Sequence, residues 1–150
     1  MKKHKAIIFI VILLVITGIL GVVHLKTRDA VPEGAIEIVS LDETQIVDIT
    51  KLGYEEVSGT RVNGKGEEIA IEALGIYLGT VLEDAGIKEY ETLSVVADDA
   101  YSVELSAVEI ADGLEVYLIQ EEDEVRLRMV VFGDKDSKRS VSNVAQIIVK

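Results

Sequence analysis

VSGTRVNGKGEEIAIEALGIYLGTVLEDAGI, residues 57–87, is the stretch that decides the fold class, because its hydrophobic period changes part-way along. The first half alternates apolar and polar residues, as a half-buried strand does. Asn63-Gly64-Lys65-Gly66 interrupts that alternation with residues that accept the positive φ of tight turns. Residues 57–63 and 67–73 are therefore predicted to pair as a β-hairpin.

A helix is predicted to follow directly, over residues 74–85. Gly86 is placed to end this helix in the left-handed conformation, and Ile87 then returns the chain to the core. The apolar residues recur at the spacing of one helical face, which we interpret as core packing. They are Leu74, Leu78, Val81, Leu82 and Ala85.

The chain before the hairpin is less regular. Ala35–Val39 alternates apolar and polar residues, which predicts a first strand. Residues 41–52 fit two conformations: their β-branched residues favour a strand, whereas Asp42 suits the N-cap of a short helix. Gly53 ends that stretch, and both alternatives remain open.

The chain after the helix is rich in predicted strands. Ser106 and Glu109 have the spacing of a capping box, which predicts a short helix over residues 107–110. Strands are predicted at residues 93–97, 101–105, 114–120, 125–132 and 145–149. Short turns join most of them, so the predicted class is α+β, with mostly antiparallel sheet and a few short helices.

The N-terminal segment Ala6–Val23 is uniformly apolar and carries no charge. About 18 to 20 helical residues cover the ~30 Å hydrocarbon core of a bilayer. Lys2, Lys3 and Lys5 precede the segment, and positive charge holds that end in the cytoplasm. Residues 6–25 are therefore predicted to be a transmembrane signal anchor of a single-pass cell-membrane protein.

The predicted organisation has four parts. A cytoplasmic basic tail, residues 1–5, precedes the anchor, and a tether with the only proline follows it over residues 26–34. An extracytoplasmic module occupies residues 35–150. A cleavable signal peptide is the competing interpretation, but its apolar region is about 7–15 residues long and ends in a small-x-small site. The segment here is longer and residues 22–26 offer no such site, which favours an uncleaved anchor.

Composition excludes several function classes. All 27 acidic residues lie after residue 26, and from Lys26 onward they face 12 basic ones, a net charge of −15. Such a surface repels nucleic acid and anionic lipid. The chain contains no cysteine, and its two histidines, His4 and His24, flank the apolar segment. The module therefore lacks the residues of a Ser-His-Asp triad, a thiolate nucleophile or an ordinary zinc site.

Four segments, taken in order, resemble the oxidoreductase molybdopterin-binding domain, which has the sulfite-oxidase-like fold. The resemblance covers roughly residues 57–150. The segments are Leu74-Gly75-Ile76-x-Leu78-x3-Leu82-x2-Ala85-Gly86-Ile87, Ala97-Asp98-Asp99-x-Tyr101-Ser102, Leu127-Arg128-Met129-Val130-Val131-x-Gly133 and Ser140-Val141-x2-Val144-x2-Ile147.

The resemblance implies a mostly antiparallel α+β domain that holds a molybdenum–pterin cofactor and performs oxygen-atom or two-electron chemistry. Lys135, Lys138 and Arg139 loosely match the family's basic loop, which reaches the cofactor phosphate, and Tyr101 is a candidate pocket residue. A solvated loop and a half-buried strand aromatic are the alternative interpretations. This sequence departs from the family in two ways: it lacks the cysteine that binds molybdenum, and its N-terminal half is shorter.

The sequence thus supports three functional hypotheses. The first is a membrane-anchored extracytoplasmic module, non-catalytic and without a cofactor, that binds a small anionic ligand or a membrane-associated protein partner. The second is a molybdopterin-dependent oxidoreductase subunit that uses Lys135, Lys138 and Arg139 for the anionic cofactor. The third is a structural accessory of a membrane assembly. The missing cysteine favours the first over the second.

Overall fold

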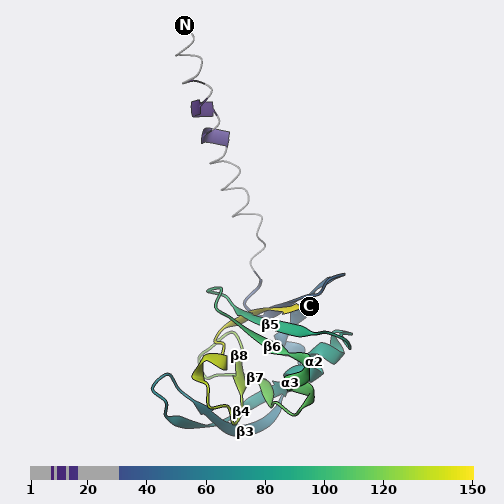
Figure 1. The fold of residues 1–150 in the computed structure, drawn as a ribbon, viewed down its shortest axis with the longest axis vertical. Coiled ribbons are helices and arrows are strands. Elements are labelled where there is room, and N and C mark those ends of the chain that lie inside the picture. Colours follow the sequence, from purple (N-terminus) through teal and green to yellow (C-terminus); the bar gives the residue numbers. More distant parts are fainter. Residues whose placement is uncertain (1–7, 9, 13, 17–30) are drawn as a thin grey trace. The chain divides into compact units, whose positions relative to one another are not determined.

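The computed structural model describes Ile8, residues 10–12, 14–16 and 31–150 (Figure 1). The chain divides into two compact units, Met1–Ala30 and Val31–Lys150. This boundary lies within the predicted tether, residues 26–34. The predicted anchor, residues 6–25, lies mostly outside the described residues, and those described within it are helical. No helix among the described residues is long and apolar enough to cross a membrane.

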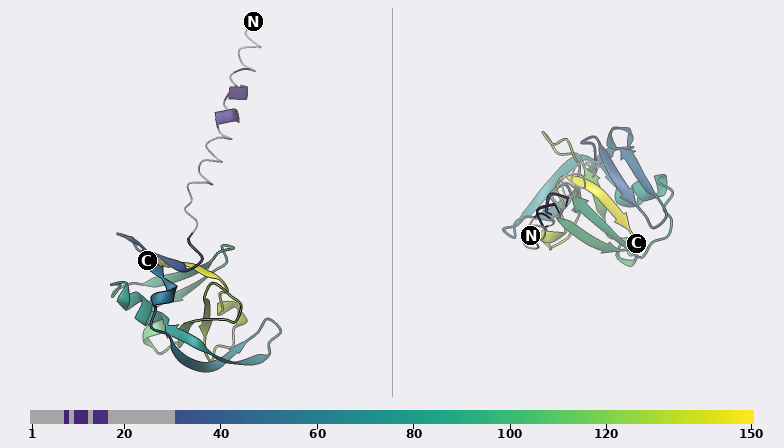
Figure 2. Two further views of the ribbon diagram at one scale, coloured as in Figure 1. Left: turned by 180° about the vertical axis from the view of Figure 1, so that it is seen from behind. Right: turned by 90° about the horizontal axis from the view of Figure 1, so that it is seen from above.

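The second unit contains a five-stranded sheet. Its strands are Ala35–Val39 (β1), Thr44–Asp48 (β2), Thr92–Ala97 (β5), Ser102–Ser106 (β6) and Val144–Val149 (β9). Their order is β2-β1-β9-β5-β6, and every neighbouring pair is antiparallel except β1 and β9, which are parallel. The first and last strands of the unit, blue and yellow in the right-hand view of Figure 2, are thus neighbours within this sheet.

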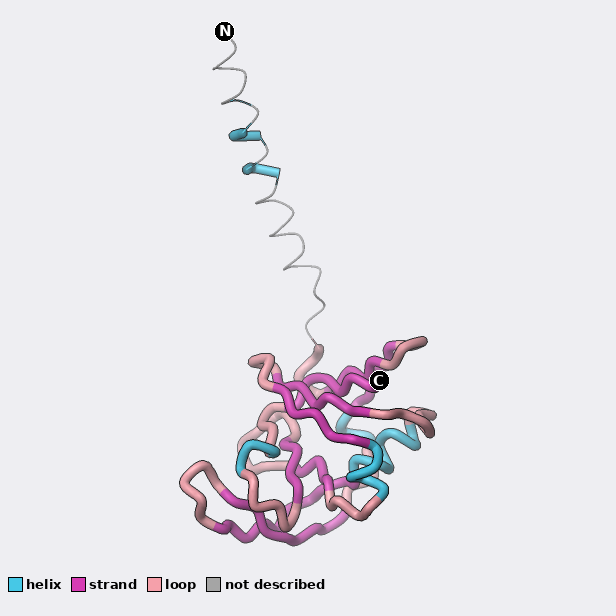
Figure 3. The backbone as a smooth tube through the Cα atoms, viewed as in Figure 1, coloured by secondary structure: helices cyan, strands magenta, loops and turns pink. Residues whose placement is uncertain are grey.

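A four-stranded antiparallel sheet forms the other half of the unit. Its strands are Glu55–Val62 (β3), Glu68–Tyr77 (β4), Val116–Ile119 (β7) and Arg128–Val131 (β8), in the order β3-β4-β7-β8. The helical segments are Leu78–Asp84 (α2), Ala107–Ala111 (α3) and two 3₁₀ turns, Ile49–Lys51 (η1) and Ser137–Arg139 (η2) (Figure 3). The predicted α+β class with mostly antiparallel strands is confirmed.

Both sheets share one hydrophobic core. Ile38 of β1 and Val95 of β5 lie in the same buried cluster as Leu118 of β7 and Met129 of β8, and Leu82 of α2 joins them. In Figure 1, β5 and β6 run along one side of the unit and the β3–β4 hairpin along the other. Burying both sheets against each other supplies the main stabilisation of a domain that has no disulfide.

The predicted start of the main helix is wrong. Residues 74–77 end strand β4, and α2 begins only at Leu78. The cause is tertiary: Gly75–Tyr77 pair with residues 117–119 of β7, which satisfies their backbone groups without a helix. Leu74, which the apolar spacing predicted to pack in the core, is 46% exposed.

The predicted end of this helix is confirmed. Gly86 has φ +79°, and its N–H donates to the carbonyl of Glu83 at 2.9 Å. The N–H of Ile87 donates to the carbonyl of Leu82 at 2.9 Å, which completes a Schellman motif. The side-chain amide of Gln45, on β2, donates to the carbonyl of Ala85 at 2.9 Å. The end of α2 is therefore tied to the five-stranded sheet.

Residues 41–52 adopt both alternatives in succession, with strand β2 followed by the turn η1. Asp48, and not Asp42, caps that turn: its carboxylate accepts from the N–H of Thr50 at 2.9 Å. Side-chain and backbone hydrogen bonds from Thr50 lower the pKa of the Asp48 carboxyl. The capping aspartate is the one at the end of the strand, where the chain turns.

The other predicted elements are confirmed, with shifted ends. The hairpin strands run over residues 55–62 and 68–77 in place of 57–63 and 67–73, and the capping box of α3 is present. The strands expected at 114–120 and 125–132 are shorter and run over 116–119 and 128–131, because the intervening loop takes up residues 120–127.

The four-stranded sheet curls on itself because the β3–β4 hairpin folds back over β8. A Cβ atom added at Gly59 of β3 would lie 2.4 Å from Cγ of Phe132, so the backbone of β3 rests directly on that ring. Next to this contact, the N–H of Gly133 donates to the carbonyl of Thr60 at 2.9 Å. The chain of β3 thus meets the end of β8, the strand at the opposite side of the sheet. A second small cluster of Ile119, Val130 and Phe132 is enclosed between them.

We expect Gly59→Ala to destabilise the module by about 1–3 kcal/mol, because the new methyl group overlaps a buried ring. Urea unfolding followed by circular dichroism measures this change. Gly53→Ala is the matched control, since a Cβ there meets no atom within 4 Å. Equal stability of the two variants would contradict the close packing of β3 on Phe132.

Candidate functional site

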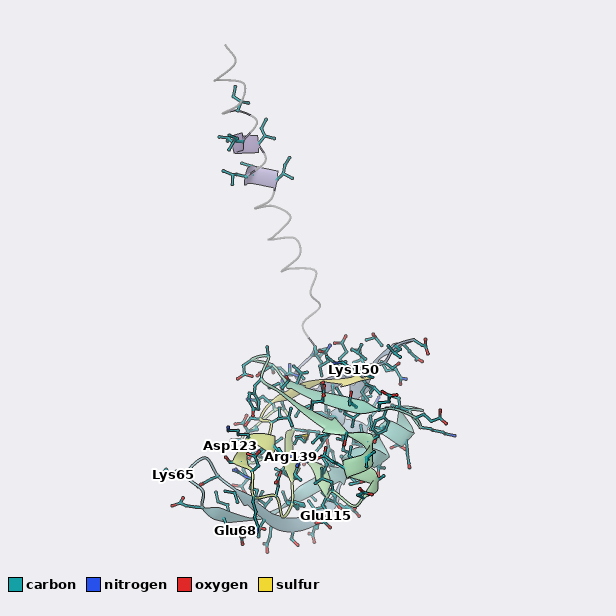
Figure 4. All side chains as sticks on the ribbon, viewed as in Figure 1. Lys65, Glu68, Glu115, Asp123, Arg139 and Lys150 are labelled. Atoms are coloured by element: carbon teal, nitrogen blue, oxygen red, sulfur yellow. The ribbon has the colours of Figure 1, made fainter. Side chains whose placement is uncertain are left out.

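The predicted basic loop does not present a free cationic cluster. Lys135 and Lys138 are exposed, but Arg139, which Figure 4 labels, is half-buried and already paired. Its Nε lies 3.2 Å from Oδ2 of Asp134, and its Nη2 lies 3.4 Å from Oε1 of Glu109 on α3. The two carboxylates neutralise the guanidinium, so Arg139 joins the loop to α3.

Two hydrogen bonds shape the same loop. Asp136 accepts from the backbone N–H of Lys138 at 2.9 Å and so caps η2. The hydroxyl of Tyr101 donates to the carbonyl of Lys138 at 2.5 Å. Tyr101 thus touches the predicted loop, but its hydroxyl is occupied by the backbone and its side chain is otherwise exposed.

These residues do not fit the molybdenum–pterin group that the resemblance implies. The chain offers no thiolate for the metal. The loop's arginine already has two carboxylate partners, and Asp134 is one of them, which repels a phosphate. Within the part of the chain that the structure describes, no three His, Cys, Asp or Glu side chains are grouped to hold a metal ion.

A groove of the module lies elsewhere, between β4 and the chain that follows β7. Residues 69–74 of β4 line one side, and residues 119–122 with Glu124 line the other. Arg61 of β3 and Arg128 of β8 also border it, and its volume is about 930 Å³. We call it the β4 groove.

The β4 groove exists because β4 is longer than its partner. All eight residues of β3 pair with β4, whereas β7 pairs only with Gly75–Tyr77. One further bond, from the N–H of Gln120 to the carbonyl of Leu74 at 2.8 Å, closes the junction. Beyond it the chain leaves β4 along the loop of residues 120–127, and the edge of β4 is left open.

Backbone groups of β4 point into this opening. Hydrogen-bonded and open pairs alternate along an antiparallel ladder. Because Leu74 uses its carbonyl on the β7 side, Glu72 and Ala70 also direct their N–H and C=O groups to that side. Among the described residues, no hydrogen bond reaches these groups. The groove therefore contains an unpaired strand edge.

The groove has an apolar floor and an acidic margin. Ile71 and Ile119 belong to the small buried cluster, and Ile69 is 36% exposed beside them. Of the charged groups, Arg128 is bound to Glu121, with Nε 2.6 Å from Oε1. The remaining charged residues are Glu72, Glu122, Glu124 and Arg61, so negative charge is in excess. Figure 4 places Glu68 near the hairpin tip and Asp123 on the loop after β7.

A second groove lies between α2 and α3. Tyr77 and Tyr90 border it, together with Leu82, Ile87 and Ile110. Desolvation raises the pKa of Tyr90, and the nearby Tyr77 adds to the shift. Both tyrosines pack against the core, which makes this groove mainly a packing feature between the two helices.

Comparisons with known proteins add no family for this chain. Neither the scan against protein-family models nor the search of curated proteins gives a match. The resemblance to the molybdopterin-binding domain therefore remains a hypothesis.

Reasoning from the sequence missed the β4 groove. The alternation of residues 68–72 predicted the strand, but an unpaired edge depends on where the neighbouring strand stops. One signal was available: Gln120–Glu124 is a polar, acidic run directly after an apolar strand, which marks the point where β7 ends.

The capping box that anchors Arg139 gives a pH-dependent prediction. Hydrogen bonds from the backbone and hydroxyl of Ser106, followed by the charge of Arg139, lower the pKa of Glu109 from its usual 4.5. Ionised Glu109 therefore stabilises the fold above that pH, and the contribution is lost as pH falls through the lowered pKa. We expect Ser106→Ala to cost about 1 kcal/mol at pH 7 and less at about pH 3.

Urea unfolding at the two pH values measures this difference. Ser102→Ala is the control, because Ser102 is exposed and, among the described residues, its hydroxyl makes no hydrogen bond. A cost for Ser106→Ala that is identical at both pH values would contradict the role of ionised Glu109.

Proposed function

We propose that this chain is a membrane-anchored extracytoplasmic module that binds a partner protein along the β4 groove and has no catalytic activity of its own. The observation that carries the proposal is the open edge of β4, flanked by Ile69 and Leu74. Unpaired strand edges invite pairing with another chain unless they are blocked. A groove open along a strand suits an extended segment of protein.

The membrane part of the proposal rests on the sequence. Ala6–Val23 is apolar and uncharged, and three lysines precede it. The molybdopterin-domain scaffold is part of the same proposal and rests on the four matched segments of the sequence. These segments span β4 and α2, the turn between β5 and β6, β8, and the start of β9 with the residues before it. The redox chemistry of that family is left out, since the chain has no cysteine.

The alternative, an oxidoreductase subunit that binds an anionic pterin, has weaker support. It needs Arg139 and its neighbouring lysines to face an anion, and Arg139 is held by Glu109 and Asp134. We therefore prefer the binding module.

Topology is testable with single cysteines, because the chain has none of its own. We expect Asp112→Cys, at an exposed position after α3, to react with a membrane-impermeant maleimide in intact cells. Lys3→Cys should react only after lysis, since the anchor keeps it in the cytoplasm. The opposite labelling pattern would contradict the proposed orientation.

Partner binding is testable by photo-crosslinking in the membrane fraction. We expect a photoreactive benzoylphenylalanine in place of Leu74, which is 46% exposed in the groove, to give a discrete adduct with another protein. The control is the same residue in place of Val108, which is 68% exposed on α3 and outside the groove. No adduct at Leu74, or equal adducts at both positions, would overturn groove binding.

A further inference from the structure

We infer that the β4 groove binds a basic, extended segment of the partner protein by adding it as a strand beside β4. This inference rests on the proposed function and deepens it, because it names the chemistry of the partner. Three features of the groove carry it: the direction of the free backbone groups, the alternation of the side chains, and the excess of acidic residues.

The backbone supplies the pairing. Ala70 and Glu72 each turn one N–H and one C=O toward the groove, while Ile69, Ile71 and Ala73 turn theirs toward β3. An extended chain laid along this edge satisfies the free groups through a regular ladder. About five residues of a strand span the open part of β4 at roughly 3.3 Å per residue.

The side chains of β4 alternate between the two faces of the strand, so the partner segment should alternate in the same way. Directly opposite residues on paired strands lie on the same face. Partner residues opposite Ile69 and Ile71 face the apolar floor beside Ile119, so they should be apolar. Partner residues opposite Glu72 lie on the other face, beside a carboxylate, so they should be lysine or arginine.

The negative charge of the groove favours a partner protein over a second copy of this chain as the occupant. Glu72, Glu122 and Glu124, which form no ion pair with any residue that the structure describes, line the groove together with Arg61. Arg128 is already bound to Glu121. Two copies paired through this edge would bring their glutamates together and repel each other. A segment with alternating lysines is attracted by the same groups. The occupant is therefore a basic segment of another protein.

The experiment measures fluorescence anisotropy of labelled nine-residue peptides with the full chain in detergent micelles. The first probe alternates lysine and valine, and the second alternates glutamate and valine. The third is the lysine–valine peptide N-methylated at alternate residues, which keeps its charge but blocks one hydrogen-bonding edge. We expect the first peptide to bind at least about tenfold more tightly than the other two.

Variants of the chain test the same contacts from the protein side. Ala70→Pro removes an N–H that faces the groove and leaves the ladder to β3 intact. Glu72→Lys reverses the charge opposite the peptide lysines, and Glu43→Lys, at an exposed turn before β2, is its control. We expect the first two variants to bind the lysine–valine peptide about tenfold more weakly and the control to bind it unchanged. Circular dichroism checks that each variant folds.

Two results would overturn the inference of a basic added strand. One is binding that is unaffected by N-methylation of the peptide, a measurement that does not depend on whether Ala70→Pro folds. The other is no preference for the basic peptide over the acidic one. In either case the crosslink from Leu74 decides separately whether the groove contacts a partner, so failure of the inference is distinguishable from failure of the proposed function.

Discussion

The contact between the backbone of Gly59 and the ring of Phe132 is the constraint on which the curled sheet depends. A hairpin with strands of eight and ten residues would otherwise extend from the domain with one face in water. With no Cβ in the way, β3 lies directly on the ring, and the bond from Gly133 to Thr60 fixes the position. The fold-back gives the four-stranded sheet a closed side and encloses the small apolar cluster.

The same fold-back explains why the sheet is open on its other side. β4 must follow β3 along its whole length, but β7 has only four residues and stays with the core. At Gly75 the strands are still closely packed, since a Cβ there would come within 2.8 Å of Val57 and 3.0 Å of Ile119. Beyond Leu74 the two chains separate. The groove is thus a consequence of unequal strand lengths in a curved sheet, and its apolar floor is the edge of the enclosed cluster.

The sequence predicted what depends on local chemistry. Gly86 ended α2 and Ser106 with Glu109 capped α3, because each device acts over three or four residues. Prediction from the sequence failed where pairing with a distant strand determines the structure. Residues 74–77 have a helical apolar spacing, yet β7 holds them in a strand. Arg139 could be placed on a basic loop, but not beside Glu109, which is 30 residues away in the chain. The β4 groove was missed for the same reason.

The acidity of the module and the open edge of β4 are connected. An open apolar edge promotes aggregation, and proteins block such edges with charge, proline or a covering segment. Here the strand itself carries Glu68 and Glu72, and the neighbouring loop carries Glu121–Glu124. These carboxylates repel other copies of the same acidic domain, which opposes pairing of this edge between copies. The repulsion is selective, because it vanishes for a strand of opposite charge. In the strand addition that we propose, protection of the edge and choice of partner follow from the same side chains.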